Sequence, residues 1–247
     1  MIKTIIQSIF KKFGVQLKKF SSSDTGRRIL LIKKNNINKI IDVGANTGQY
    51  ALEMRRDGFK GEIVSFEPLA EAFLKLRNNA KNDKKWQVYD YAIGNENGRT
   101  FINIAGNSVS SSISNMQDSH LKAAPESSYI GKEEISINKL DSLFHNFYSE
   151  DDRIILKIDT QGFEKNVIDG AEKFLEKVIL LQLEMSLIRL YENEMLFDEM
   201  IEYLKARNFQ IISLENGFFD KQSGQLFQVD GIFINKNNEK SNKSFLH

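Results

Sequence analysis

The sequence predicts one α/β domain built on a mostly parallel sheet with helices on both faces. From Lys39 onward, short apolar segments typical of strands alternate with segments of helical periodicity, which is the pattern of strand–helix–strand units. A chain of 247 residues, 41% of them hydrophobic, is long enough to bury one large core. Glycine or acidic residues follow several strands, at the sheet edge where such folds bind ligands.

The elements follow from the apolar runs and their breaks. The first half is predicted to hold strands at Lys39–Val43, Glu62–Phe66, Trp86–Tyr91 and Thr100–Ile104, with helices from the glycine turn to about Asp57 and at Ala70–Ala80. The second half is predicted to hold strands at Ile135–Ile137, Arg153–Ile158, Val178–Leu183, Phe209–Leu214 and Phe227–Ile234. Helices are expected at Leu140–Phe147, Glu164–Lys177 and Glu194–Arg207, and Asn216-Gly217 suggests a hairpin-type turn before the last strand.

Three segments stand outside this alternation. Residues 1–20 repeat apolar side chains at helical spacing with lysines between them, so residues 1–34 are predicted to be an amphipathic helical extension before a domain at 35–235. This helix either packs on the domain or makes a peripheral contact with the inner face of a membrane or with a partner. Residues 105–134 are polar and serine-rich, too long for an ordinary connection, and are expected to form a substrate flap. Residues 236–247 are a polar tail.

Composition excludes several classes of protein. The chain has 34 Lys plus Arg against 33 Asp plus Glu, which disfavours a nucleic-acid binder because phosphate neutralisation needs a basic excess. There is no cysteine, so disulfides, a thiolate nucleophile and a cysteine-ligated zinc are excluded. No apolar run approaches the ~20 residues of a membrane-spanning helix, and no secretory signal is recognisable, so we expect a cytoplasmic protein.

The turn after the first strand reads Asp42-Val43-Gly44-Ala45-Asn46-Thr47-Gly48. Gly44 permits a tight turn, Asn46 tolerates the left-handed backbone region, and Gly48 leaves room for the following helix. The spacing is neither the dinucleotide fingerprint nor a phosphate-binding P-loop. Asp42 would repel a pyrophosphate but would suit the cationic ammonium of S-adenosylmethionine, so this turn is predicted to bind that cofactor, although strand–glycine–helix turns also occur without one.

The next two strand ends supply further cofactor candidates. Glu67 follows the second strand and is expected to accept hydrogen bonds from ribose hydroxyls, while Pro68 stops the strand. The third strand closes with Asp90, Tyr91 and Ala92, where a small residue would leave space for a flat adenine. A solvated glutamate in a turn is the alternative for Glu67.

Acidic residues also follow the strands predicted at Arg153–Ile158 and Val178–Leu183. Asp159 comes directly after an apolar strand, Glu164 follows shortly, and Glu184 ends the next strand. Together they are suited to orient an acceptor hydroxyl, take its proton or hold a cation, although Glu164 is equally suited to cap a helix. His120 lies in the serine-rich segment and is expected to be solvated.

Taken in order, these motifs resemble the FkbM family of methyltransferases. The resemblance rests on Ile41–Gly48, Phe66–Pro68, Ala92–Gly94, Leu156–Asp159 with Gly162 and Glu164, and Gln228–Phe233, and the serines at 108–112 resemble that family's serine-rich stretch. It covers roughly 39–235. Gln161 departs from it, because the family often has a second acid there.

The resemblance implies a Rossmann-like class I methyltransferase fold, with a seven-stranded sheet and an antiparallel last strand, that uses S-adenosyl-L-methionine. It also implies O-methylation of a hydroxyl on a sugar, glycoconjugate or polyketide-like molecule. The predicted cofactor residues are Asp42, Gly44, Asn46, Gly48, Glu67, Pro68, Asp90, Ala92 and Asp159. Asp159 is the first candidate for the base and Glu184 the second; no metal ligand is predicted.

Three alternatives stay open. An NAD-dependent oxidoreductase shares the acidic residue after the second strand but not the glycine spacing. Transfer to nitrogen is a second, although the turn after Asp159 lacks the Asn/Asp-Pro-Pro-Tyr-like sequence typical of such enzymes. The third is a catalytically inactive, membrane-associated protein that binds the cofactor.

Overall fold

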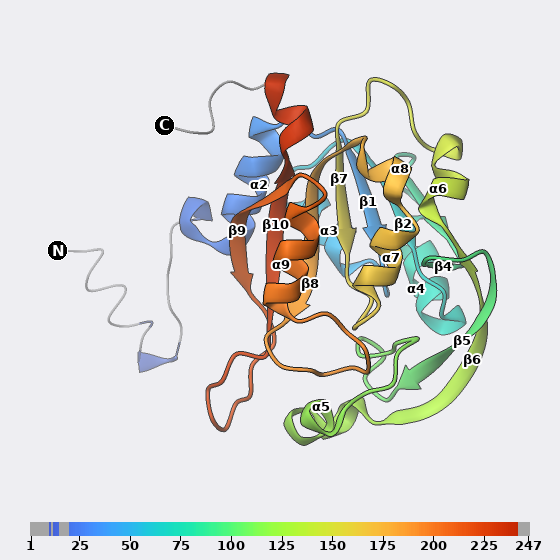
Figure 1. Cartoon of the computed structure of the whole chain (residues 1–247), viewed down its shortest axis with the longest axis vertical. Helices are drawn as coiled ribbons and strands as arrows, with labels where there is room; N and C mark the ends of the chain where they lie inside the picture. Colours follow the sequence, from blue (N-terminus) through green and yellow to red (C-terminus); the bar gives the residue numbers. More distant parts are fainter. Residues whose placement is uncertain (1–9, 11, 15–19, 242–247) are drawn as a thin grey trace.

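A seven-stranded sheet forms the centre of the protein in the computed structural model, which describes residues 10, 12–14 and 20–241 (Figure 1). In spatial order the strands are β3 (Trp86–Tyr89), β2 (Glu62–Phe66), β1 (Lys39–Val43), β7 (Ile154–Ile158), β8 (Val178–Ser186), β10 (Gln228–Asn235) and β9 (Phe209–Asn216). β10 runs antiparallel to both β8 and β9, and the other six strands of this sheet run in one direction. The predicted mostly parallel sheet and its antiparallel last strand are confirmed.

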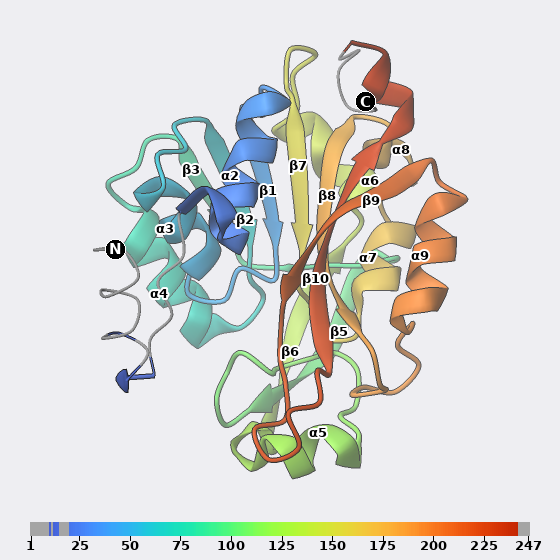
Figure 2. The ribbon, with the colours of Figure 1, turned by 90° about the vertical axis from the view of Figure 1, so that its left-hand side faces the viewer.

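The central strands are apolar because both faces of the sheet are covered. Every residue of β1 and β7 is buried, as expected for parallel strands between two helical layers. On one face lie α2 (Asp24–Lys34), α3 (Gln49–Arg56) and α4 (Ala70–Ala80); on the other lie α6 (Leu140–Leu143), α7 (Glu164–Asp169), α8 (Glu172–Leu175) and α9 (Phe197–Lys205) (Figure 2).

A smaller sheet lies at the carboxyl ends of the central strands. Its order is β4 (Ala92–Ile93), β6 (Tyr129–Asn138) and β5 (Gly98–Ala105), with β5 and β6 antiparallel. Residues 129–134, predicted to be part of the flap, belong to β6. The rest of the segment forms a loop, α5 (Asp118–Ala123) and η2 (Pro125–Ser127), seen at the bottom of Figure 2.

Several predicted elements have other bounds in the structure, and two of them differ for a clear physical reason. The helix predicted at Glu164–Lys177 is split into α7 and α8 at Gly170, where an added Cβ would lie 1.8 Å from the Gly94 carbonyl oxygen and Asp141 caps the second helix. The chain between β9 and β10 does not reverse at Asn216-Gly217. It reverses at 220–224, where the Asp220 side chain accepts hydrogen bonds from the backbone of Gln222 and Ser223.

The ends of the chain are described only in part. The helix predicted for residues 1–20 lies largely outside the described residues. The helix α2 begins at Asp24, where the Gly26 amide donates a hydrogen bond to Ser23 Oγ. The short helices η1 (Phe20–Ser22), η3 (Phe144–Asn146) and η4 (Lys236–Ser241) complete the described chain. Each helix that the structure describes is too short or too polar to cross a bilayer.

Gly48 lies at a close contact between the turn after β1, the helix α4 and the strand β3. It has φ +92°, and an added Cβ would lie 2.8 Å from Trp86 and 2.9 Å from Leu76. Gly58 has nearly the same φ, +91°, with nothing within 4 Å of an added Cβ. We expect Gly58→Ala to lower the free energy of unfolding by about 1–2 kcal/mol, because a residue with a Cβ is strained in the left-handed backbone region. Gly48→Ala should lower it by roughly a further 1–3 kcal/mol, because its Cβ would also overpack the contact with Trp86 and Leu76. Urea unfolding measures both; equal losses would show that the close contact costs nothing.

Candidate active site

A cavity of about 330 Å³ opens at the carboxyl edge of the sheet. The turn after β1, the turn after β2, the turn after β7 and the serine-rich loop form its walls. Its size is within the range of small-molecule sites. Of the predicted site residues, Gly44, Asn46, Glu67, Pro68, Ala92 and Asp159 line it.

The turn after β1 is shaped by positive backbone angles. Gly44 has φ +76°, and an added Cβ would lie 1.9 Å from the Asp159 carbonyl oxygen, so only glycine lets β1 and β7 end side by side here. Asn46 has φ +47°, which confirms the predicted left-handed conformation. Gly48 makes room for Trp86 and Leu76 rather than for β1, and it does not line the cavity.

Glu67 connects the first two turns. Its Oε2 accepts a hydrogen bond from the Asn46 amide at 2.8 Å, and its Oε1 accepts one from the Leu69 amide at 2.9 Å. Burial raises the pKa of Glu67 to about 7, against these two hydrogen bonds, which lower it. The carboxylate is therefore a fixed part of the cavity wall and not a solvated turn residue, with lone pairs left for a ligand.

Beneath the cavity a row of polar side chains crosses the sheet. Ser65, Asp42, Lys157 and Gln182 occupy neighbouring register positions on β2, β1, β7 and β8. Ser65 donates to Asp42 Oδ2 at 3.2 Å, and the Lys157 ammonium lies 3.2 Å from Asp42 Oδ1. Asp42 is thus fully buried under the turn and does not line the cavity, where the sequence had suggested it would meet the cofactor.

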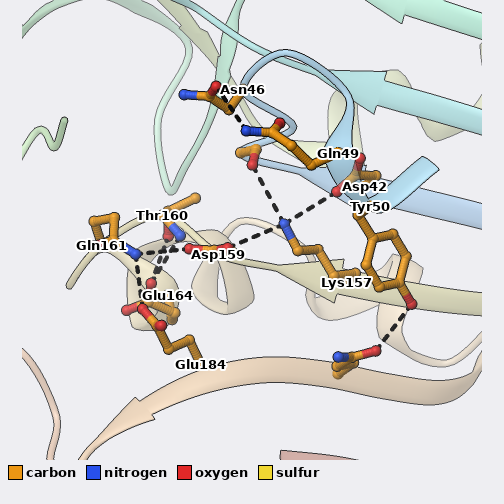
Figure 3. Close-up of polar contacts among 12 residues, drawn as sticks. Asp42, Asn46, Gln49, Tyr50, Lys157, Asp159, Thr160, Gln161, Glu164 and Glu184 are labelled. Atoms are coloured by element: carbon orange, nitrogen blue, oxygen red, sulfur yellow. Dashed lines mark hydrogen bonds and ion pairs between the residues drawn. The ribbon is translucent and has the colours of Figure 1, made fainter. Parts of the chain in front are cut away.

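Lys157 is the centre of this row (Figure 3). Its ammonium also lies 3.4 Å from Asp159 Oδ2 and 3.4 Å from the Gly44 carbonyl oxygen. Burial lowers the pKa of Lys157, but the carboxylates of Asp159 and Asp42 raise it more, so it stays above its usual value. Burial likewise raises the pKa of Asp42, while the Lys157 charge opposes that shift.

Asp159 and Glu184 are joined by one amide. The side chain of Asp159 is 37% exposed and lines the cavity. Glu184 does not line it, and burial together with the charges of Asp159 and Asp230 raises the pKa of Glu184 well above its usual value. The Gln161 amide nitrogen donates to both carboxylates, at 2.9 Å and 2.8 Å (Figure 3).

Glu164 has a structural position. Its Oε1 accepts hydrogen bonds from the amides of Thr160 and Gly162 in the turn before α7, and it does not line the cavity. Burial raises the pKa of Glu164 to about 7. Glu164 therefore ties the turn before α7 together, whereas the sequence had offered the helix end as its partner. Asp90 is exposed and also lies outside the cavity.

The serine-rich segment is tied down by its own side chains. Ser110 and Ser127 hydroxyls lie 3.1 Å apart, and Ser112 Oγ donates to the Gln161 carbonyl oxygen at 2.6 Å. Ser108 lines the cavity. The prediction of a solvated His120 is wrong: this side chain is 3% exposed and packs against the rings of Tyr191 and Phe218, because α5 turns it inward.

The sheet edge divides the cavity into two sides. Its apolar side, facing the small sheet, is lined by Ala92, Ile93, Ile102, Ile113 and Phe163; its polar side, facing α2 and α3, is lined by Arg28, Tyr50, Glu53, Lys157, Gln182 and Asp230. Sequence reasoning missed the polar side as a site. Lys157 and Asp230 each stood within a quoted motif, whereas Arg28 comes from a segment assigned to the extension.

Two carboxylates hold the Arg28 side chain in place on the polar side of the cavity. Its guanidinium lies 2.6 Å from Glu215 and 3.5 Å from Glu53, and 5.3 Å above the Tyr50 ring. Tyr50 in turn donates to Gln182 at 2.9 Å. Burial raises the pKa of Asp230 to about 6.

Among the residues that the structure describes, no group of three His, Cys, Asp or Glu is arranged to hold a metal ion.

The strand order and the cavity at the carboxyl edge of the sheet define a Rossmann-like fold. The family model described as "Methyltransferase FkbM domain" matches residues 42–211. The chain belongs to this family.

The chain is also similar to two known proteins. The 2-O-methyltransferase NoeI of Sinorhizobium fredii is 24% identical over 216 residues, which cover 84% of this chain and 87% of NoeI. The crystal structure of methyltransferase FkbM from Methylobacillus flagellatus superposes with a TM-score of 0.54 at 14% identity, covering 87% of this chain. This chain spans about half of that protein, 48% of its length, and the likeness shows the fold alone.

The ion pair between Lys157 and Asp42 should contribute to the stability of the fold. Lys157→Met would leave Asp42 buried without its cation, which typically costs 3–5 kcal/mol, roughly. The comparison change, Lys165→Met, removes a partly exposed i,i+4 pair with Asp169 and should cost less, about 1 kcal/mol. Urea unfolding at neutral pH compares the two. A Lys157→Met protein as stable as Lys165→Met would contradict the importance given to this pair.

Proposed function

We propose that this protein is an S-adenosylmethionine-dependent O-methyltransferase acting on a hydroxyl of a sugar, glycoconjugate or polyketide-like molecule. The observation that carries the proposal is the two-sided cavity, with an apolar side and a polar side and with Glu67 in its wall. S-Adenosylmethionine has a flat apolar base, a ribose and an amino-acid end, in that order. The base fits the side of Ala92 and Phe163, the ribose hydroxyls fit Glu67, and the amino acid fits the polar side.

The charge of the wall favours a cation. Four acids, Glu53, Glu67, Asp159 and Asp230, line the cavity against two basic residues, Arg28 and Lys157. When all are ionised the wall is net negative, which attracts a sulfonium and an ammonium and repels a dinucleotide pyrophosphate. The cavity is therefore a better match for S-adenosylmethionine than for NAD, in agreement with the family.

The acceptor class rests on a relative and on charge. NoeI is described as a 2-O-methyltransferase, and it is similar to this chain over most of both lengths. The chain's near-neutral balance of 34 basic and 33 acidic residues gives no general attraction to nucleic acid. Both points support a small hydroxyl-bearing acceptor.

The residues of the site have distinct roles in this proposal. The bound cofactor would supply a methyl group on a sulfonium whose leaving group is neutral. Glu67 and the turn at 44–46 would hold the nucleoside, and the closed wall would keep water from the reacting atoms. Asp159 would accept the hydroxyl proton, because its carboxylate lines the cavity at the end of β7 and its side chain is 37% exposed. Lys157 would stabilise its charge.

Titration calorimetry tests the cofactor. We expect the native chain to bind S-adenosylmethionine and not NAD, and Glu67→Ala to weaken binding by about 1–3 kcal/mol, because the loop amides and ribose lose a partner. Glu71→Ala, an exposed change on α4, is the control and should bind normally. Binding of NAD instead, or no effect at Glu67, would refute the assignment.

The same binding should depend on pH. Glu67 has a raised pKa of about 7, so it gains its negative charge as the pH rises through that value. A cationic ligand prefers the charged form, and affinity should therefore increase roughly fivefold from about pH 6 to about pH 7.5. Glu67→Gln should remove most of this increase and leave the smaller part due to Asp230, whose pKa is about 6. A Glu67→Gln protein with an unchanged pH profile would exclude Glu67 as the titrating group.

Asp159→Asn tests the base. Removing the negative charge should lower methyl transfer from tritiated S-adenosylmethionine by about 100-fold or more, with cofactor affinity within about threefold. The acceptors are p-nitrophenyl glycosides of hexoses, 6-deoxyhexoses and 2-acetamido sugars, with simple phenols and amines alongside. Normal turnover by Asp159→Asn would eliminate Asp159 as the base. Transfer to the amines alone would replace the O-methyltransferase by an N-methyltransferase.

A further inference from the structure

Gln161 lies between two carboxylates, and its side chain uses all of its hydrogen-bonding groups. Its Nε2 donates to Asp159 Oδ1 at 2.9 Å and to Glu184 Oε2 at 2.8 Å (Figure 3). Its Oε1 accepts a hydrogen bond from the Tyr191 hydroxyl at 2.7 Å. An ionised carboxylate only accepts, so beside an ionised Asp159 the amide turns its NH₂ group toward the acids and its oxygen toward the Tyr191 hydroxyl.

The backbone beneath this amide is held from three sides. Gln161 has φ +56°, and Gly162 has φ +88° with no room for a Cβ, which would lie 2.5 Å from Tyr191. Ser112 Oγ donates to the Gln161 carbonyl oxygen at 2.6 Å, and Ser114 Oγ donates to that of Gly162 at 3.3 Å. The serine-rich segment and the Tyr191 loop thereby fix the turn.

Asp159 is accordingly held at both oxygens. Lys157 lies 3.4 Å from Oδ2, on the side of the buried polar row, and Gln161 donates to Oδ1. Without the amide, the attraction of Lys157 alone would turn the carboxylate toward the floor of the cavity. The second carboxylate, Glu184, would keep only the Gln228 amide, at 2.7 Å.

We propose that Gln161 is a positioning residue that holds the Asp159 carboxylate at the cavity edge and keeps it apart from Glu184. The neutral amide lets two acids lie close together while only one of them faces the ligand. Tyr191 extends this support by fixing the amide from behind. The proposal rests on the proposed function in that Asp159 is the group that accepts the hydroxyl proton.

Three variants test the role of the amide. Gln161→Met keeps the length of the side chain and removes all three hydrogen bonds, so kcat should fall about 10- to 100-fold with KM for S-adenosylmethionine nearly unchanged. Tyr191→Phe keeps both bonds from the amide to the carboxylates, removes the bond to Gln161 Oε1 together with a long 3.5 Å bond to the Ser110 carbonyl oxygen, and should lower kcat by less, about threefold to tenfold. Gln161→Glu places a third carboxyl between Asp159 and Glu184 and should be the least active at neutral pH.

The pH profile separates positioning from a structural role. Groups facing position 161 are Asp159, Glu184 and Tyr191, with Lys157, Glu164 and Asp230 behind them. When the new carboxyl of Gln161→Glu is protonated it can donate to one neighbour again. Its activity relative to wild type should therefore rise at least about tenfold from about pH 8 to about pH 6, at saturating cofactor. Gln210→Glu, an exposed change on β9, should keep the wild-type profile.

The outcomes distinguish this proposal from the proposed function. If wild type transfers methyl groups to the glycoside panel and Gln161→Met and Gln161→Glu match it at every pH, the positioning role is overturned and the function stands. If wild type transfers none, crystal structures of wild type and Gln161→Met decide. Asp159 turned toward Lys157 in Gln161→Met supports the positioning role, and an unmoved carboxylate overturns it.

Discussion

The buried ammonium of Lys157 is the contact on which the carboxyl edge of the sheet depends. It neutralises Asp42 beneath the first turn, donates to the Gly44 carbonyl oxygen within that turn, and approaches Asp159 at the cavity edge. A buried charge is tolerated only when it is paired, so each of these groups requires the others. The close approach of Gly44 to Asp159 brings the two strand ends into the geometry that the ion pairs need.

This arrangement explains how one sheet edge serves both stability and chemistry. The acids that are fully enclosed, Asp42 and Glu164, compensate a cation or cap a turn. Glu67 and Asp159 face the cavity, and their free lone pairs are available to a ligand. In the proposed methyl transfer the protein mainly aligns two reactants and excludes water, which agrees with a wall whose charged groups are fixed in position before the ligand arrives.

Much of the fold was predictable because buried parallel strands are continuous apolar runs and the turns between them carry glycine. β1, β2 and α4 were placed with the bounds that the structure shows, and the left-handed Asn46 followed from its residue type. The sequence did not predict that Asp42 and Glu184 would lie outside the cavity. Their surroundings depend on which strands become neighbours and in which register. Arg28 was missed because α2 packs beside a site encoded far along the chain, and His120 because α5 closes over apolar side chains.

A crystal structure of the protein soaked with S-adenosylmethionine tests the central claim most directly. We expect the adenine to lie against Ala92 and Phe163 and the ribose hydroxyls to bind Glu67. The amino-acid end should lie on the polar side, with the methyl group directed toward Asp159. An empty cavity under saturating cofactor, or a nicotinamide dinucleotide bound there in its place, would contradict it.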